Sequence, residues 1–98
     1  MEHLPSESLT RLYRVLDAVE SEAECRELLA DLCTVGELED MAQRLDAAFL
    51  LADGKNYQDI SGATGLSTAT ISRVSKALKY GKGYRLAIER ERAREEAK

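Results

Sequence analysis

One segment near the middle of the chain, NYQDISGATGLSTATISRVSKALK at residues 56–79, restricts the fold more than any other. Gly65 lies between two short helical patterns, at a point where a tight turn needs a residue that accepts a positive φ. Ile60 precedes this glycine and Ile71 follows it, at offsets where two steeply crossing helices bury apolar side chains against each other. This spacing predicts a helix-turn-helix motif.

The residues next to the turn fit the same motif. Ser61 is small where the two helices touch, and Leu66 is placed to fill the core behind the turn. Ser67 is a favoured N-cap residue, so the second helix is expected over residues 67–78. The alternative is an ordinary helical hairpin with a glycine turn. Because that hairpin needs only some of these offsets and all of them are met, we favour the helix-turn-helix.

Helical patterns also cover the chain before this motif. Ser21 and Thr34 each precede a glutamate by three residues, the spacing of a capping box, and each is expected to begin a helix. An earlier helix is expected to open at Pro5-Ser6. The helix after Thr34 has the longest apolar pattern in the sequence and is expected to stop at Gly54.

After the motif, Gly81 and Gly83 interrupt the helical pattern, and a charged helix is expected over residues 84–98. No strand pattern is present. The sequence therefore predicts an all-α fold of six helices in a single domain of residues 1–98. A chain of 98 residues with only four tyrosines and one phenylalanine has a thin core, because small domains bury a small fraction of their surface. We therefore expect a second copy to complete the core in a homodimer.

Several features of the sequence bear on the cellular compartment of the protein. No apolar run approaches the roughly 20 residues of a membrane span, and the first residues lack the pattern of a secretory signal. Cys25 and Cys33 would lie about 12 Å apart on one helix, which is too far for a disulfide. We expect both to be reduced and to act as small buried hydrophobic residues, and we expect the chain to be cytoplasmic.

The net charge of −4 would by itself disfavour binding to nucleic acid, but the charges are unevenly distributed. Residues 1–50 carry 12 acids and 4 bases, whereas residues 51–98 carry 6 acids and 10 bases. No acid occurs over residues 61–87, where five bases fall: Arg73, Lys76, Lys79, Lys82 and Arg85. A phosphate backbone responds to a local basic face more than to the total charge, so this stretch favours a nucleic-acid partner.

The second helix of the motif keeps small, polar and basic residues once its buried positions are removed. These suit a helix that lies in the major groove of DNA with its N-terminal residues at the base edges. Arg73 can reach guanine or a phosphate, and Ser72 can bond to a base edge. Tyr57 and Gln58 open the first helix, where helix N-termini commonly hold a phosphate. The residues expected to contact DNA are Tyr57, Gln58, Ser67, Thr68, Ala69, Ser72, Arg73, Lys76 and Lys79.

Two segments carry a family resemblance: TATISRVSKALKYG in the second helix of the motif, and LLADLCTVGELEDMAQRLDAAFLLADG before it. They resemble the Trp repressor superfamily, most closely its YerC/YecD-type relatives, over a stretch from about Leu28 to Glu89. The resemblance implies an all-α, intertwined homodimer in which the long helix and its neighbours cross between subunits. It also implies a repressor-like role at two-fold symmetric operators.

The resemblance also bears on a small effector. In the Trp repressor two arginines clamp an amino-acid corepressor, and they match Arg44 and Arg73; a threonine that contributes a carbonyl matches Thr34. The glycine that leaves space for the indole is Val74 here, and the serine near the ligand's ammonium is Ala77. Tryptophan is therefore not expected as an effector, although another ligand is not excluded. The alternative is that Val74 turns into the core, as the helix-turn-helix pattern expects, and that part of the pocket survives. For Arg44 we favour the alternative of a surface or interface salt bridge.

These patterns predict a sequence-specific DNA-binding transcriptional regulator, a repressor, whose partners are double-stranded DNA and a second copy of the chain. The alternative is a helical protein–protein interaction module that uses its acidic N-terminal half. An enzyme is not expected, because the single histidine, His3, lies at the terminus and no nucleophile–base pair, phosphate loop or metal-ligand spacing appears. No cofactor is expected, and the effector is left unknown.

Overall fold

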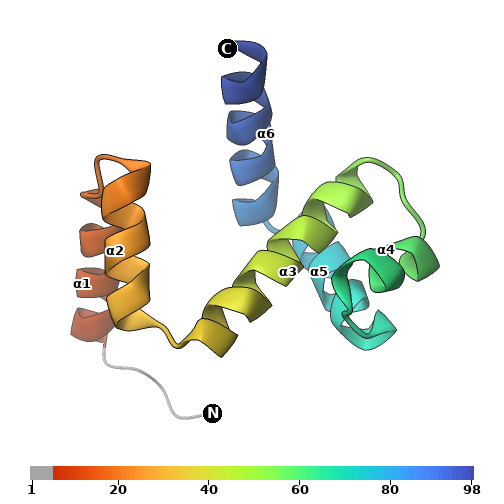
Figure 1. The fold of residues 1–98 in the computed structure, drawn as a ribbon, viewed down its shortest axis with the longest axis horizontal. Helices are drawn as coiled ribbons and strands as arrows, with labels where there is room; N and C mark the ends of the chain where they lie inside the picture. Colours follow the sequence, from red (N-terminus) through yellow and green to blue (C-terminus); the bar gives the residue numbers. More distant parts are fainter. Residues whose placement is uncertain (1–5) are drawn as a thin grey trace. The chain divides into compact units, whose positions relative to one another are not determined.

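A computed structural model describes residues 6–98 of the chain and contains six α-helices over that range (Figure 1). They are α1 (Ser6–Asp17), α2 (Glu22–Leu32), α3 (Val35–Ala52), α4 (Tyr57–Thr64), α5 (Thr68–Tyr80) and α6 (Gly83–Glu96). The predicted all-α class with six helices is confirmed. Ser6 begins the first helix as expected, whereas Pro5 and His3 lie outside the described residues. None of the helices over residues 6–98 has the length and apolar content that a membrane crossing requires.

Of the two predicted capping boxes, the one at Thr34 is complete and the one at Ser21 is formed in part. The Thr34 Oγ1 accepts the Glu37 backbone N–H at 3.1 Å, and the Glu37 carboxylate accepts the Thr34 N–H at 2.8 Å, which is a full capping box. The Ser21 Oγ accepts the Glu24 N–H at 3.1 Å, but the Glu24 carboxylate accepts the N–H of Glu20. Both serine and threonine therefore begin their helices where the sequence predicts.

The chain forms two compact units, which divide between residues 38 and 39. In the first unit, none of the described residues is buried. Most large apolar residues of α1 are exposed, with Leu12, Val15 and Leu16 at 38%, 42% and 40% and Tyr13 at 62%, and Leu9 is half-buried. This unit therefore has no core of its own in a single chain.

The two cysteines, Cys25 and Cys33, belong to this first unit and are both free, as expected. They are half-buried rather than buried, which corrects the expectation that they act as core residues. The difference follows from the open packing around them, since no neighbouring residue of the unit is buried either.

The second unit, residues 39–98, holds the buried core of the chain. Its buried apolar residues come from four helices: Ala47, Ala48, Ile60, Ile71, Val74 and Ile88. Ile60 and Ile71 are the largest side chains that are fully buried, and they come from the two helices of the predicted motif. In Figure 1, α4 and α5 form a close pair after the loop that follows α3. The predicted helix-turn-helix is thus the centre of this unit.

The turn between α4 and α5 is built as the sequence predicts, with one addition. Gly65 ends α4 in the left-handed region at φ 78°, and its N–H donates to the carbonyl of Ser61 at 2.8 Å. Ser61 also donates its hydroxyl to the Leu66 carbonyl at 2.8 Å. The addition is Thr64, a buried polar residue that donates to the Ile60 carbonyl at 2.7 Å and accepts the Leu66 N–H at 3.2 Å.

The end of α5 differs from the prediction. The helix continues two residues beyond 78, to Tyr80, and Gly81 is its C-cap, with an N–H that donates to the Ala77 carbonyl at 2.9 Å. A Cβ at position 81 would lie 2.7 Å from that oxygen, so this glycine is required by close packing. Gly83, expected as a break, is the first residue of α6.

We predict opposite effects for alanine at two glycines of α4 and its turn. Gly65→Ala should destabilise the protein by about 1–2 kcal/mol, because the φ of 78° is costly for any residue with a Cβ. Gly62→Ala, the matched control inside α4, should stabilise it by about 0.5–1 kcal/mol, because an added Cβ meets nothing within 4 Å. Urea unfolding at one fixed protein concentration measures both. Equal effects for the two variants would contradict this account of the turn.

Candidate nucleic-acid interface

One side of α5 is buried and the opposite side is exposed. Ile71 and Val74 face the core, with 0% and 3% of their surface exposed. The exposed residues of α5 are Thr68, Ala69, Arg73, Lys76, Ala77, Lys79 and Tyr80, and Ser72 is half-buried at the edge of this side. Every residue of α5 that the sequence predicts to contact DNA therefore retains access to solvent. We call this side of the helix the exposed face of α5.

The first turn of α5 is fixed by its cap. The Ser67 Oγ accepts the Thr70 N–H at 3.2 Å, and the same hydroxyl lies 3.2 Å from the Thr70 Oγ1. Ser67 therefore has a structural role as well as a position at the end of the exposed face. Because this cap satisfies a backbone N–H that has no partner within the helix, it stabilises the first turn, which carries Thr68 and Ala69.

Tyr57 and Gln58 begin α4, as expected, and both are exposed. The residue that caps this helix is Asn56, whose side-chain oxygen accepts the Asp59 N–H at 2.8 Å. An N-terminus of this kind presents backbone N–H groups that can hold a phosphate. Asp59 places a negative charge in the same turn, which weakens that attraction.

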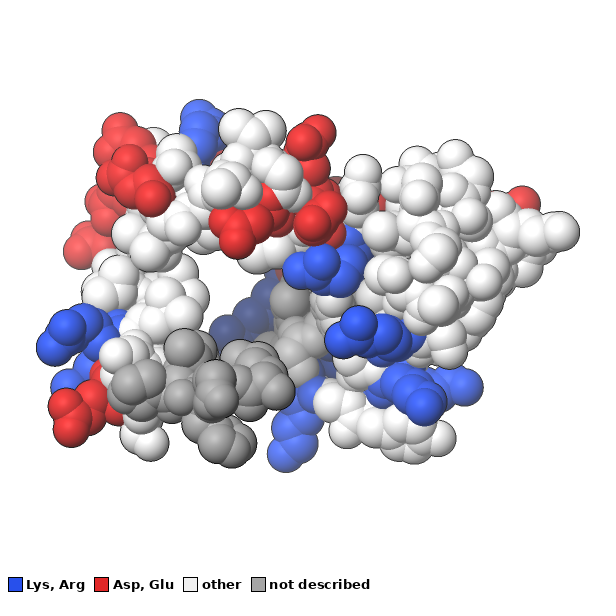
Figure 2. Space-filling view, turned by 90° about the horizontal axis from the view of Figure 1, so that it is seen from below, with Lys and Arg blue, Asp and Glu red and all other residues white. Residues whose placement is uncertain are grey.

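Positive charge in the second unit is concentrated in one stretch of its sequence. Residues 61–87 carry no acid, and the five bases of that stretch include Arg73, Lys76 and Lys79 on α5. Figure 2 shows lysine and arginine side chains of this unit gathered together in the right half of the view. Such a concentration of positive charge is the electrostatic feature that a phosphate backbone recognises.

A pocket of about 530 Å³ lies beside α5 in the second unit. Its lining residues are Arg44, Thr70, Arg73, Val74, Ala77 and Tyr84. The two arginines that the resemblance implies for an effector, one on α3 and one on α5, therefore line one pocket. Val74 belongs both to the core and to the pocket wall. Tyr84, from α6, was not expected there.

The other residues implied for an effector site are placed as follows. Thr34 belongs to the first unit, where it caps α3 and its carbonyl accepts the Leu38 N–H at 3.0 Å. Arg44 is half-buried and forms no ion pair within residues 6–98 of one chain. The expected salt bridge between Arg44 and an acid of the same chain is therefore not formed within residues 6–98.

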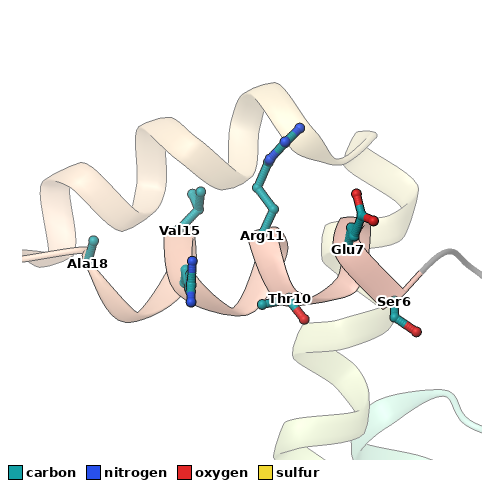
Figure 3. Close-up of a pocket in the computed structure, with 7 residues that line it drawn as sticks. Ser6, Glu7, Thr10, Arg11, Val15 and Ala18 are labelled. Carbon is teal, nitrogen blue, oxygen red and sulfur yellow. The ribbon is translucent and has the colours of Figure 1, made fainter.

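A second hollow, also of about 530 Å³, follows α1 in the first unit. Its residues come from this helix and the turn after it: Ser6, Glu7, Thr10, Arg11, Arg14, Val15 and Ala18. Figure 3 shows that Thr10 and Arg11 point away from each other, so the polar groups do not converge on one point. Over residues 6–98, no group of His, Cys, Asp and Glu side chains could hold a metal ion. The hollow on α1 has the features of a shallow groove rather than of a reaction site.

Sequence reasoning missed three residues of this region. Asn56 could have been found, because an asparagine three residues before an acid is a common helix cap. Thr64 gave no signal, since its hydrogen bonds depend on how the turn closes. Tyr84 lines the pocket only because α6 packs against α5, which no local pattern predicts.

Comparisons with known proteins agree on one family. The family model described as Trp repressor protein matches residues 7–92. The chain is 38% identical over 91 residues to the "Uncharacterized protein YerC" of Bacillus subtilis strain 168, covering 92% of this chain and 88% of that protein. A crystal structure of a putative Trp repressor from Staphylococcus aureus matches with a TM-score of 0.82 and 35% identity, over 90% of this chain and 89% of the other. A TrpR-like protein from Eubacterium eligens matches with the same TM-score and identity, over 89% and 91%.

Proposed function

The chain belongs to the Trp repressor family, and from this premise we propose that it is a sequence-specific DNA-binding regulator of transcription, a repressor that reads the major groove with α5. The family is one of non-enzymatic regulators, which confirms that the chain is not an enzyme. The single observation that carries the proposal is the exposed face of α5, where all predicted contact residues of that helix are accessible and no acid occurs.

Each part of this face has its own task in the proposal. Thr68 and Ala69, near the capped N-terminus, meet thymine methyl groups, and Arg73 reaches a guanine or a phosphate. Lys76 and Lys79 lie further along the helix, where the backbone of the DNA passes, and bind phosphates. Tyr57 and Gln58 at the start of α4 hold a further phosphate.

Two substitutions on this face should have different effects on DNA binding. Arg73→Ala should weaken binding to a selected operator by about 1–3 kcal/mol if it contacts a base, and should relax the preference at that base. Lys79→Ala should weaken binding to all sequences alike and lower the slope of affinity against salt by about one unit. Fluorescence anisotropy over a range of salt concentrations measures both effects, with duplexes first selected from a random pool.

Arg26→Ala provides the control, because this arginine lies in α2 and pairs with Glu22 rather than belonging to the proposed interface. Its affinity for DNA should equal that of the parent protein. If the parent protein retains no duplex from the random pool at low salt, DNA binding is refuted. The helical protein–protein interaction module then becomes the better description.

We also propose that the protein acts as a homodimer and that residues 1–98 form a single domain only in that dimer. The first unit supports this, because its apolar side chains on α1 have no core to enter within that unit. The second unit leaves Leu45 of α3 and Leu86 of α6 exposed at 41% and 46%. A hollow of about 420 Å³ between α3 and α6 is lined in part by Leu45 and Phe49. A second copy that covers these surfaces would remove the apolar area from water.

A charge placed on the apolar side of α1 should therefore weaken the dimer. Leu16→Asp should raise the dimer dissociation constant about ten- to hundredfold, because burying one leucine is worth about 1.5–3 kcal/mol. Ser8→Asp, which adds the same charge at an exposed polar position of the same helix, should leave the constant unchanged. Sedimentation equilibrium measures both. A parent protein that is a stably folded monomer at micromolar concentration would be incompatible with the dimer.

The pocket beside α5 leads us to propose that tryptophan is not the effector. Val74 occupies part of the pocket wall with a β-branched side chain, and Ala77 offers no hydroxyl to a ligand's ammonium group. A packed site tolerates added volume poorly, and a polar group buried without its partner is costly. The two arginines could still attract another anion.

Calorimetry with L-tryptophan should therefore show no saturable binding in the micromolar range. Titrations of DNA binding with and without L-tryptophan should give equal affinities for DNA. Saturable binding together with a rise in DNA affinity would show that the pocket accepts the indole despite Val74. L-tryptophan injected into buffer without protein is the control for heats of dilution.

A further inference from the structure

Tyr80, the last residue of α5, exposes most of its aromatic side chain to water. It is 84% exposed, the largest fraction among the exposed large hydrophobic residues of the described chain. It follows Ala69, Arg73 and Lys76 at intervals of four, three and four residues, which places all four along one stripe of a helix. Tyr80 therefore continues the exposed face of α5, and it is the one aromatic side chain on it.

The backbone that carries Tyr80 is firmly held. Arg85, on α6, donates from Nη2 to the carbonyl of Lys79 at 2.8 Å and to that of Leu78 at 3.3 Å. The N–H of Gly81 satisfies the Ala77 carbonyl, and a Cβ at position 81 would meet that oxygen at 2.7 Å. The carbonyls of Ala77, Leu78 and Lys79 in the last turn are thus all bonded. Tyr80 is presented from an anchored corner rather than from a loose helix end.

The length of α5 determines what this corner meets on DNA. From Thr68 to Tyr80 the helix rises about 18 Å, at about 1.5 Å a residue. The major groove is only about 12 Å wide. When α5 enters the groove with its N-terminal end and crosses its width, a helix of this length carries its C-terminal end over the sugar-phosphate backbone. Lys79 and Lys82 flank Tyr80 there with positive charge.

We propose that Tyr80 is a DNA-backbone contact, whose phenol O–H donates to a phosphate oxygen while its ring lies against the adjoining sugar. The proposal rests on the DNA-binding function proposed above and adds a residue to it. Tyrosine hydroxyls are among the common donors to phosphate oxygens, and such contacts fix the position of a protein without reading sequence. A neutral donor also releases no counterion, unlike the lysines beside it.

The test compares Tyr80→Phe and Tyr80→Ala with Lys79→Ala on two duplexes, a selected operator and an unrelated sequence. Tyr80→Phe should weaken binding to both duplexes about three- to tenfold, because it removes one hydrogen bond. Tyr80→Ala should weaken it further, because the ring contact is lost as well. Neither change should alter the slope of affinity against salt, whereas Lys79→Ala should lower it by about one unit.

Circular dichroism and sedimentation of the Tyr80 variants show whether the fold and the oligomeric state are kept. If the parent protein binds DNA and Tyr80→Ala binds equally well, this inference is overturned while the proposed function stands. A loss of binding that coincides with a changed oligomeric state also overturns it, because Tyr80 would then be a contact between protein chains. If the parent protein binds no duplex at all, the proposed function itself fails first.

Discussion

The burial of Ile60 and Ile71 in one cluster, across the turn at Gly65, is the constraint on which the second unit depends. These two side chains bring α4 and α5 together, and the left-handed glycine allows the chain to reverse over a very short distance. Thr64 and Ser61 then bond the turn from inside. Because one side of α5 is committed to this core, its opposite side must face outward. The exposed face follows from the packing behind it.

Features that depend on neighbouring residues in the chain could be predicted from the sequence. Thr34 and Glu37 form their capping box because both partners lie within one turn of helix. Gly65 and Ser67 mark the ends of α4 and α5 for the same reason, since a positive φ and a side-chain cap are local requirements. The family resemblance then supplied the implied pairing of Arg44 with Arg73, which the pocket beside α5 brings together.

Features that depend on distant residues could not be predicted. The end of α5 was placed too early, because Gly81 can end a helix as a C-cap or break it earlier, and only the contact with Ala77 decides. Arg85 bonds carbonyls six and seven residues before it, a connection that requires the angle between α5 and α6. The side chain of Val74 is a second example. The sequence did not decide whether it would face the core or the pocket, because the packing of α5 determines this, and Val74 contributes to both.

The uneven charge of the chain has a consequence for the proposed DNA-binding function, namely for how the protein would search for an operator. A genome offers a vast excess of non-operator sites, and attraction to phosphate holds a protein on all of them alike. Here residues 1–50 carry a balance of −8, so much of the surface is repelled by any duplex. Only an approach through the basic stretch of residues 61–87 is favourable, and screening limits the attraction to about 8 Å at physiological salt. Encounters in the wrong orientation would therefore be brief.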